Sequence, residues 1–171
     1  MQESKVIKIG CGEWGFRNRP MREHFEIARE FDIKWLEFGI GGNQIGRLSE
    51  FPESDEIEGF KSLNQEFGIE TPFCCIENDF TLADEKDHLK MLDKVKKQIQ
   101  AAADCGAKQV RLFAGFTAVE EVSPKIWERM IKAFADADQL CESLGLTIAI
   151  ETHGGITFDE EESAHHFNSV S

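Results

Sequence analysis

The sequence predicts an α/β fold of parallel β-strands, and three observations predict it. Short apolar runs alternate along the 171-residue chain with longer segments whose apolar residues recur at helical spacing. The strand-helix unit repeats at a spacing of roughly 35 residues, too long for hairpins and right for helical crossovers. Several of the apolar runs end in glycine beside polar or charged residues. Such regular alternation is typical of parallel strands joined by helices.

The N-terminal half of the chain shows start and stop signals for two helices. Pro20 suits the first turn of a helix, and Gly68 follows a run of residues with helical spacing as a natural stop. The expected elements, in order, are a strand at 6–12, a helix at about 20–31, a strand at 33–39, a helix at about 56–67 and a strand at 69–76.

The C-terminal half repeats the pattern. Ser123 and Pro124 form a cap followed by a first-turn proline, and Gly106 and Gly145 end the two long helices. The acidic tail, 157–171, is expected to begin a fifth helix. The other expected elements are a helix at about 84–105 with Leu89, Leu92, Val95, Ile99 and Ala102 on one stripe, a strand at 109–115, a helix at about 123–144 and a strand within 145–155.

Alternation along the strands assigns side chains to two faces. In the last strand Glu151 and His153 share a face, and Ile148 and Ile150 share the opposite face, which is free to pack against helices. Glu37 is placed on one face with Trp35, and Arg111 is placed on one face with Phe113, in the same way. We therefore expect the charged side chains to lie on the face away from the helices.

Two closures fit parallel strands with helical crossovers, a doubly wound sheet and a (βα)8 barrel. Three strand ends are alike, LEFGIGG after Trp35, RLFAGF from Arg111 and IETHGG from Ile150, and this weak repeat favours the barrel. The absence of GxGxxG at a helix start and of a P-loop disfavours a nucleotide-binding sheet. We predict an incomplete TIM-type barrel of about five βα units, with residues 1–171 as a single domain.

Charge and cysteine usage narrow the function classes. The 19 basic and 32 acidic residues give a formal charge of −13, which repels phosphate backbones and anionic lipid, so neither nucleic acid nor a membrane is an expected partner. The five cysteines are odd in number and have no CxxC spacing, and the N-terminus has no secretory apolar run. These features predict a soluble protein of the reducing cytoplasm.

The strand ends carry a family resemblance. Trp35 to Gly39 (WLEFG), Val110 to Gly115 (VRLFAG) and above all Leu146 to Gly155 (LTIAIETHGG) are similar to the xylose isomerase-like (AP endonuclease family 2) TIM barrels, which include sugar and sugar-phosphate isomerases and epimerases. The resemblance implies a divalent metal held at the carboxyl ends of the strands, with Glu151 as its fifth-strand ligand. Manganese, magnesium or cobalt suits oxygen ligands, and zinc is compatible. The implied reaction is proton transfer beside a carbonyl, with Glu151 as ligand first and base second. His153 is a candidate for orienting the substrate or for holding a metal ligand in place.

Other residues have a functional and a structural interpretation, and both stay open. Glu37 is a candidate for binding the substrate, or it is a polar residue at a strand end that pairs with a lysine. Arg111 is a candidate for holding a sugar hydroxyl or phosphate, or an internal ion pair with Glu37 or Glu151. Trp14 is a candidate apolar wall for a sugar, together with Phe113, or packs only. Asn78, beside Asp79, is a candidate substrate ligand or a loop residue. His24 and His88 are expected on helix surfaces, and His165 and His166 on a solvated helix face.

Length sets a limit on the predicted function. A complete barrel needs roughly 250 residues and eight strands, so the sequence predicts a truncated member or a fragment whose remaining metal ligands lie elsewhere. We expect these 171 residues alone to bind metal weakly and to turn over no sugar, and their open strand edges to favour a homo-oligomer.

Two alternatives to an isomerase or epimerase are a non-catalytic half-barrel that self-associates and an endonuclease IV-like phosphodiesterase. The latter is opposed by the net charge and by strand ends at 77–79 and 113–115 that lack histidines.

Overall fold

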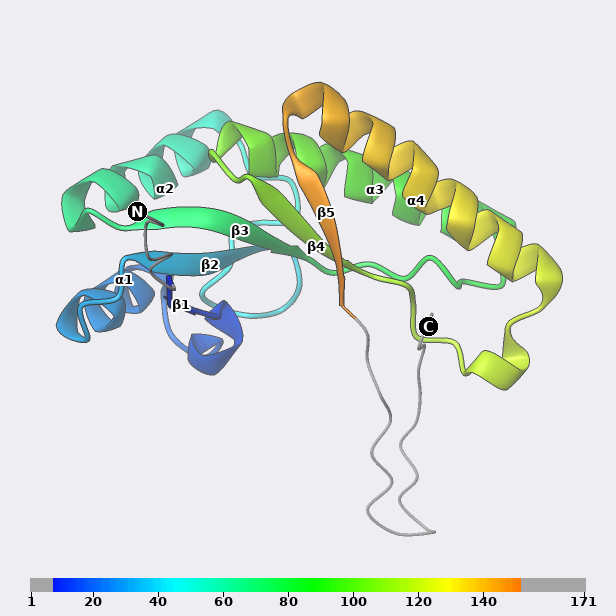
Figure 1. The fold of residues 1–171 in the computed structure, drawn as a ribbon, viewed down its shortest axis with the longest axis horizontal. Helices are drawn as coiled ribbons and strands as arrows, with labels where there is room; N and C mark the ends of the chain where they lie inside the picture. Colours follow the sequence, from blue (N-terminus) through cyan, green and yellow to red (C-terminus); the bar gives the residue numbers. More distant parts are fainter. Residues whose placement is uncertain (1–7, 152–171) are drawn as a thin grey trace, which may run out of the picture.

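The computed structural model describes residues 8–151, which form one parallel sheet with helices against it (Figure 1). The sheet has five strands in the order β1-β2-β3-β4-β5, and every neighbouring pair is parallel. The strands are β1 (Gly10–Cys11), β2 (Trp35–Ile40), β3 (Glu70–Ile76), β4 (Gln109–Phe113) and β5 (Thr147–Glu151). The helices are α1 (Met21–Glu30), α2 (Ser54–Phe67), α3 (Glu85–Asp104) and α4 (Pro124–Leu144), with short 3-10 turns η1 (Glu13–Phe16) and η2 (Val119–Glu121).

The sequential strand order decides between the two predicted closures. A doubly wound sheet reverses its strand order at a switch point, which sends helices to both faces. Here each strand lies beside its predecessor in the chain, and Figure 1 shows α2, α3 and α4 arrayed along one side of the sheet. This arrangement is that of a barrel wall, and the predicted α/β fold of partial TIM-barrel type is confirmed.

The helix ends follow local signals in the sequence. Asp84 caps α3 by accepting a hydrogen bond from the Asp87 amide (3.0 Å), and Ser123 caps α4 by accepting one from the Ile126 amide (3.3 Å). Gly145 ends α4 in the left-handed region at φ 71°. The predicted boundaries of these helices are therefore confirmed to within one or two residues.

The core lies between the sheet and the helices, as the alternation predicted. Its strand members lie on the face of β2 to β4 opposite Glu37 and Arg111, and Phe25, Phe60 and Phe67 pack over them from the helices. Phe38 contacts Phe60 with ring centroids 4.5 Å apart. The fully buried strand residues on this face include Phe38, Ile40, Cys74, Ile76, Val110 and Leu112.

Two histidines and one leucine were assigned to the wrong faces. His24 and His88 are buried, not on helix surfaces, and Leu89 is 57% exposed, not in the core stripe of α3. The positions 88, 95, 99 and 102 form the buried stripe, and polarity concealed that a histidine begins it. His24 lies one turn before Ala28 on the buried face of α1.

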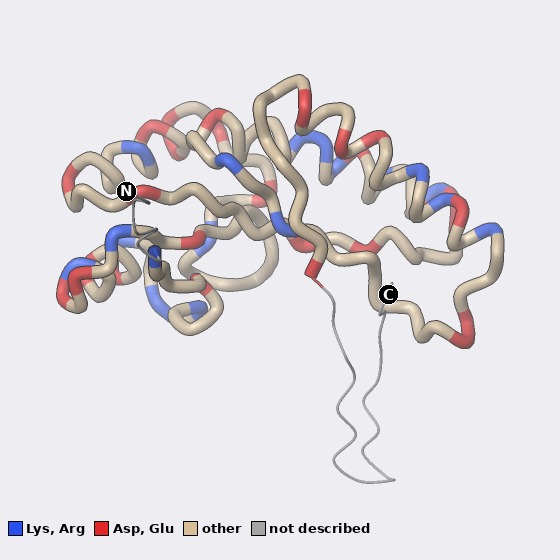
Figure 2. Tube along the Cα trace, viewed as in Figure 1, with Lys and Arg blue, Asp and Glu red and all other residues tan. Residues whose placement is uncertain are grey.

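The outer helices carry charges of both signs, and the cysteines of the described residues are unpaired. Figure 2 shows acidic and basic positions interspersed along α3 and α4. The five cysteines, all within 8–151, are free thiols, and Cys105 and Cys141 are buried. Among residues 8–151 no helix combines the length and apolarity that a bilayer crossing requires. The predicted fifth helix, His165 and His166 lie outside the described residues.

Candidate active site

The face of the sheet away from α2, α3 and α4 carries the predicted charged side chains in layers. Gly39, Cys75, Arg111 and Ala149 are aligned across β2 to β5. One layer nearer the carboxyl ends, Phe113 is aligned with Glu151. In a barrel this face is the interior and its carboxyl end is where active sites lie.

Arg111 and Glu151 form an ion pair in this interior. The Arg111 Nε lies 2.8 Å from Glu151 Oε2, and the two side chains are 17% and 41% exposed. The Arg111 guanidinium carbon lies 4.3 Å from the centre of the Phe113 ring. Of the interpretations left open for Arg111, the ion pair with Glu151 is thus the one that the structure contains.

Burial and charge act oppositely on Arg111. Burial acts to lower its pKa, and the surrounding groups, Cys75 first and then Glu151 and Glu37, outweigh it, so that the pKa is raised. The thiol of Cys75 has its own pKa raised, chiefly by burial, and is therefore protonated at neutral pH. Arg111 lies one layer from Glu37 on one side and one layer from Glu151 on the other.

Glu37 points into the same interior from β2. Its Oε2 accepts a hydrogen bond from the Glu13 amide (3.3 Å). Together with Trp35 and Phe73 it lines a hollow of about 280 Å³ beside β1. The Glu37 carboxylate therefore has one backbone donor and an adjoining space. Its role in binding a substrate stays a prediction.

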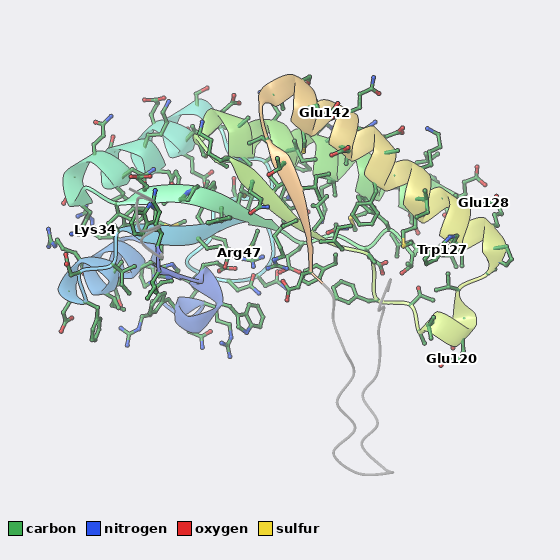
Figure 3. The ribbon with its side chains drawn as sticks, viewed as in Figure 1. Lys34, Arg47, Glu120, Trp127, Glu128 and Glu142 are labelled. Atoms are coloured by element: carbon green, nitrogen blue, oxygen red, sulfur yellow. The ribbon has the colours of Figure 1, made fainter. Side chains whose placement is uncertain are left out.

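A buried ionic network, which the sequence did not predict, lies at the carboxyl ends of β1 to β3. Its central residue, Arg47, is labelled in Figure 3. The guanidinium of Arg47, whose side chain is 1% exposed, donates through Nε to Glu13 Oε1 (3.0 Å) and through Nη1 to Glu77 Oε1 (2.8 Å). Arg47 Nη2 also bonds Glu13. Burial acts to lower the pKa of Arg47, and the two carboxylates outweigh it, so that the pKa is raised. One guanidinium thus connects the loops that follow three strands.

Gly39 makes room for this network. The loop after β2 folds back along its own strand, since the Leu48 amide donates to Gly39 O (3.0 Å) and the Gly41 amide donates to Leu48 O (2.9 Å). A Cβ on Gly39 would lie 2.4 Å from Arg47 Nε. The glycines at the end of β2 were the available signal in the sequence, but they do not reveal which side chain fills the space.

Asn78 and Asp79 join the ends of β3 and β4. The side chain of Asn78 is buried and makes two hydrogen bonds to the backbone of Phe113. Its Nδ2 donates to Phe113 O (2.7 Å), and its Oδ1 accepts from the Phe113 backbone N–H (2.8 Å). Asp79 Oδ1 accepts from the amides of Thr81 (2.8 Å) and Phe116 (3.3 Å). Both residues therefore fix the loops, which is one of their two predicted roles, and substrate binding by Asn78 remains an untested prediction.

The remaining predicted residues are placed as follows. Trp14 is half-exposed in η1, with the guanidinium of Arg17 4.7 Å from its ring centre. Phe113 is buried and contacts Phe116 at 5.3 Å between ring centroids. His153 lies outside the described residues.

This interior offers the kind of donor atom that the expected metal prefers. Glu151 supplies an oxygen donor at the carboxyl end of a strand, and the guanidinium beside it marks a position where a positive charge is already held. In residues 8–151 no three His, Cys, Asp or Glu side chains are grouped closely enough to hold a metal. If Glu151 is a metal ligand, as the resemblance implies, the described part of the chain would supply that one donor, and further donors would have to come from other residues.

Comparisons with known proteins agree with the fold. The family model described as "Xylose isomerase-like TIM barrel" matches residues 25–169. No match was found among curated protein sequences.

Solved structures similar to this chain include two sugar epimerases and a zinc-bound protein. A 3-keto-D-glucoside 4-epimerase from E. coli is 17% identical with a TM-score of 0.66, and the match covers 85% of this chain and 56% of that one. The IolI protein with a bound zinc atom is 15% identical with a TM-score of 0.67, covering 84% and 51%. An L-ribulose 3-epimerase is 16% identical with a TM-score of 0.64, covering 85% and 49%. This chain spans about half the length of these structures, and at these identities the likeness shows the fold alone.

Proposed function

The chain belongs to the xylose isomerase-like TIM barrel family, and from that premise we propose that it contributes to a divalent-metal-dependent sugar isomerase or epimerase. The reaction would transfer a proton to or from a carbon beside a carbonyl. The substrate would be a small sugar or sugar phosphate, consistent with the sugar epimerases among the similar structures. The expected location is the cytoplasm.

One observation carries the proposal: the carboxylate of Glu151 faces the barrel interior at the carboxyl end of β5. Its 2.8 Å contact with the Arg111 guanidinium supports a role in holding a cation, as a metal ligand does. Its partial exposure keeps it accessible to a ligand, unlike Glu13, which is enclosed.

The residues of this chain would take the following parts. A divalent metal, manganese, magnesium or cobalt by preference and zinc as an alternative, would supply polarisation of the substrate carbonyl when bound. Glu151 would hold it and take up the carbon-bound proton. Glu37 would accept a hydrogen bond from a sugar hydroxyl, and His153 would orient the substrate. The half-exposed ring of Trp14 would offer an apolar wall to a sugar face.

The proposal is tested by solvent exchange. The protein encoded by the natural reading frame, extended beyond Ser171 wherever that frame continues, is incubated in D2O with Mn²⁺ and a panel of ketoses and ketose phosphates. We expect NMR to show deuterium at a carbon beside the carbonyl, and the exchange to be lost in Glu151→Gln.

Glu142→Gln, the same substitution at an exposed position of α4, is the matched control and should leave the rate unchanged (Figure 3). No exchange with any sugar, or equal exchange in Glu151→Gln, would remove the basis of the proposal. The downstream frame is also expected to encode an aspartate, a histidine and a glutamate at three further strand ends.

A second candidate function, self-association of a half-barrel, is favoured by the apolar edge at β5. Ile150 is half-exposed and, with Ile148 and Phe134, lines a hollow of about 260 Å³. Size-exclusion chromatography of the 171-residue chain should then give a dimer or larger species. A compact monomer would count against obligatory assembly.

A further inference from the structure

Arg111 occupies the position that a cation bound to Glu151 would need. We propose that Arg111 is a displaceable internal cation that competes with a divalent metal for the Glu151 carboxylate, so that metal binding requires the guanidinium to leave. This inference rests on the proposed metal role of Glu151. It adds a determinant of metal affinity on β4, a strand that supplies no metal ligand in the proposal above.

The geometry explains why Arg111 reaches Glu151. In the sheet register Arg111 is aligned with Ala149, whose small side chain leaves space above the neighbouring strand. The arginine extends through this space by one layer, toward the carboxyl end, and its Nε meets Glu151 Oε2 at 2.8 Å. The Phe113 ring, 4.3 Å from the guanidinium carbon, supports it from the same strand. The alignment of β4 with β5 therefore brings Arg111 and Glu151 together.

The guanidinium is incompletely satisfied where it lies. Its Nη1 is buried and has no hydrogen-bond partner among the described residues. A buried donor without a partner makes an arrangement less stable than a fully bonded one. The contrast is Arg47, which bonds two carboxylates through all three of its nitrogens. Of the two interior arginines, Arg111 is thus the one whose displacement costs less.

A second acceptor lies within electrostatic reach of Arg111. The carboxylate of Glu37 is on the same interior face and acts on the charge of Arg111. When a metal takes Glu151, the guanidinium can turn toward Glu37 and remain neutralised inside the barrel. The positive charge would then move from one carboxylate to the other without leaving the interior.

Direct measurement of Mn²⁺ binding tests the competition. Free Mn²⁺ is followed by EPR during titration of the protein encoded by the natural reading frame, extended beyond Ser171 wherever that frame continues, and of its variants Arg111→Met, Arg111→Lys and Glu151→Gln. Circular dichroism checks that each variant folds. Arg111→Met removes the competing charge and keeps an unbranched side chain, so we expect Mn²⁺ to bind about tenfold or more tightly than to the unaltered chain. Arg111→Lys keeps the charge and should bind more weakly than Arg111→Met.

Glu151→Gln should lose the site, and it should do so in combination with Arg111→Met as well. If Arg111→Met does not fold, Arg111→Gln, which is also uncharged, takes its place. Equal affinity in the unaltered chain and in Arg111→Met, with loss in Glu151→Gln, would overturn the competition and leave the metal role of Glu151 standing. Absence of binding in every variant would overturn both, and tight binding that persists in the double variant would place the metal away from Glu151 and overturn the competition.

Discussion

Arg47→Met should destabilise the fold strongly because it removes the one cation of a buried network. The Glu13 and Arg47 side chains are each 1% exposed, and the guanidinium bonds both Glu13 and Glu77. Removing one partner of a buried ion pair leaves an uncompensated charge and costs about 3–5 kcal/mol. A domain has roughly 5–15 kcal/mol of stability in total, so the variant should unfold at a much lower urea concentration.

Urea unfolding followed by circular dichroism measures this loss, with the slope compared between variants to confirm that the unfolding transition is the same. Arg22→Met is the matched control, because Arg22 makes two bonds to Glu66 (2.7 and 2.8 Å) but both side chains are half-exposed. Its loss should be small. Adding Glu13→Gln to Arg47→Met should restore part of the stability by removing the stranded charge. The reasoning fails if Arg47→Met and Arg22→Met are equally mild, or if the double variant is less stable than Arg47→Met.

Three further predictions concern the stability of the fold. Gly39→Ala should cost about 1–3 kcal/mol through overpacking against Arg47, and urea unfolding should show that this cost largely disappears in an Arg47→Met background; an unchanged cost there would contradict the contact. Asn78→Ala removes two buried bonds to Phe113 and should lower the unfolding free energy by about 1–3 kcal/mol, whereas a shift within error would show that the bonds are not important for stability. His88 has a pKa lowered chiefly by burial and then by the charge of Arg129, so the folded state binds fewer protons than the unfolded state, and the unfolding free energy falls as the pH drops below about 6.5. Unfolding at pH 7.5 and 5.5 should show a smaller drop in His88→Gln, and an equal drop would refute the assignment.

The parts of the fold that depend on periodicity were predictable. Alternation placed Phe38 against the helices and Glu37 in the interior, and the strand spacing predicted parallel pairing. The register that brings Arg111 to Glu151 was not determined, because alternation fixes a face and not the partner across it. From the sequence alone, Glu37 and Glu151 were therefore equal candidates for the ion-pair partner of Arg111.

The parts that depend on loop paths or on buried polar groups were not predictable. Arg47 lies in a loop, and only the return of the chain along β2 brings it over Gly39. His24 was assigned to a surface by polarity, yet its Nε2 lies 3.0 Å from both Phe16 O and Arg19 O and is satisfied by backbone inside the fold. Such bonds depend on tertiary structure and have no periodic signal.

The central claim is the proposal that Glu151 is a metal-site residue of this xylose isomerase-like TIM barrel. Crystals grown with Mn²⁺ test it most directly. Anomalous diffraction locates manganese without reference to activity. We predict a peak about 2.1 Å from a Glu151 carboxylate oxygen, with the Arg111 guanidinium withdrawn from that oxygen. A Mn²⁺-saturated protein in which Arg111 still pairs with Glu151 and the anomalous peak lies elsewhere would contradict the account.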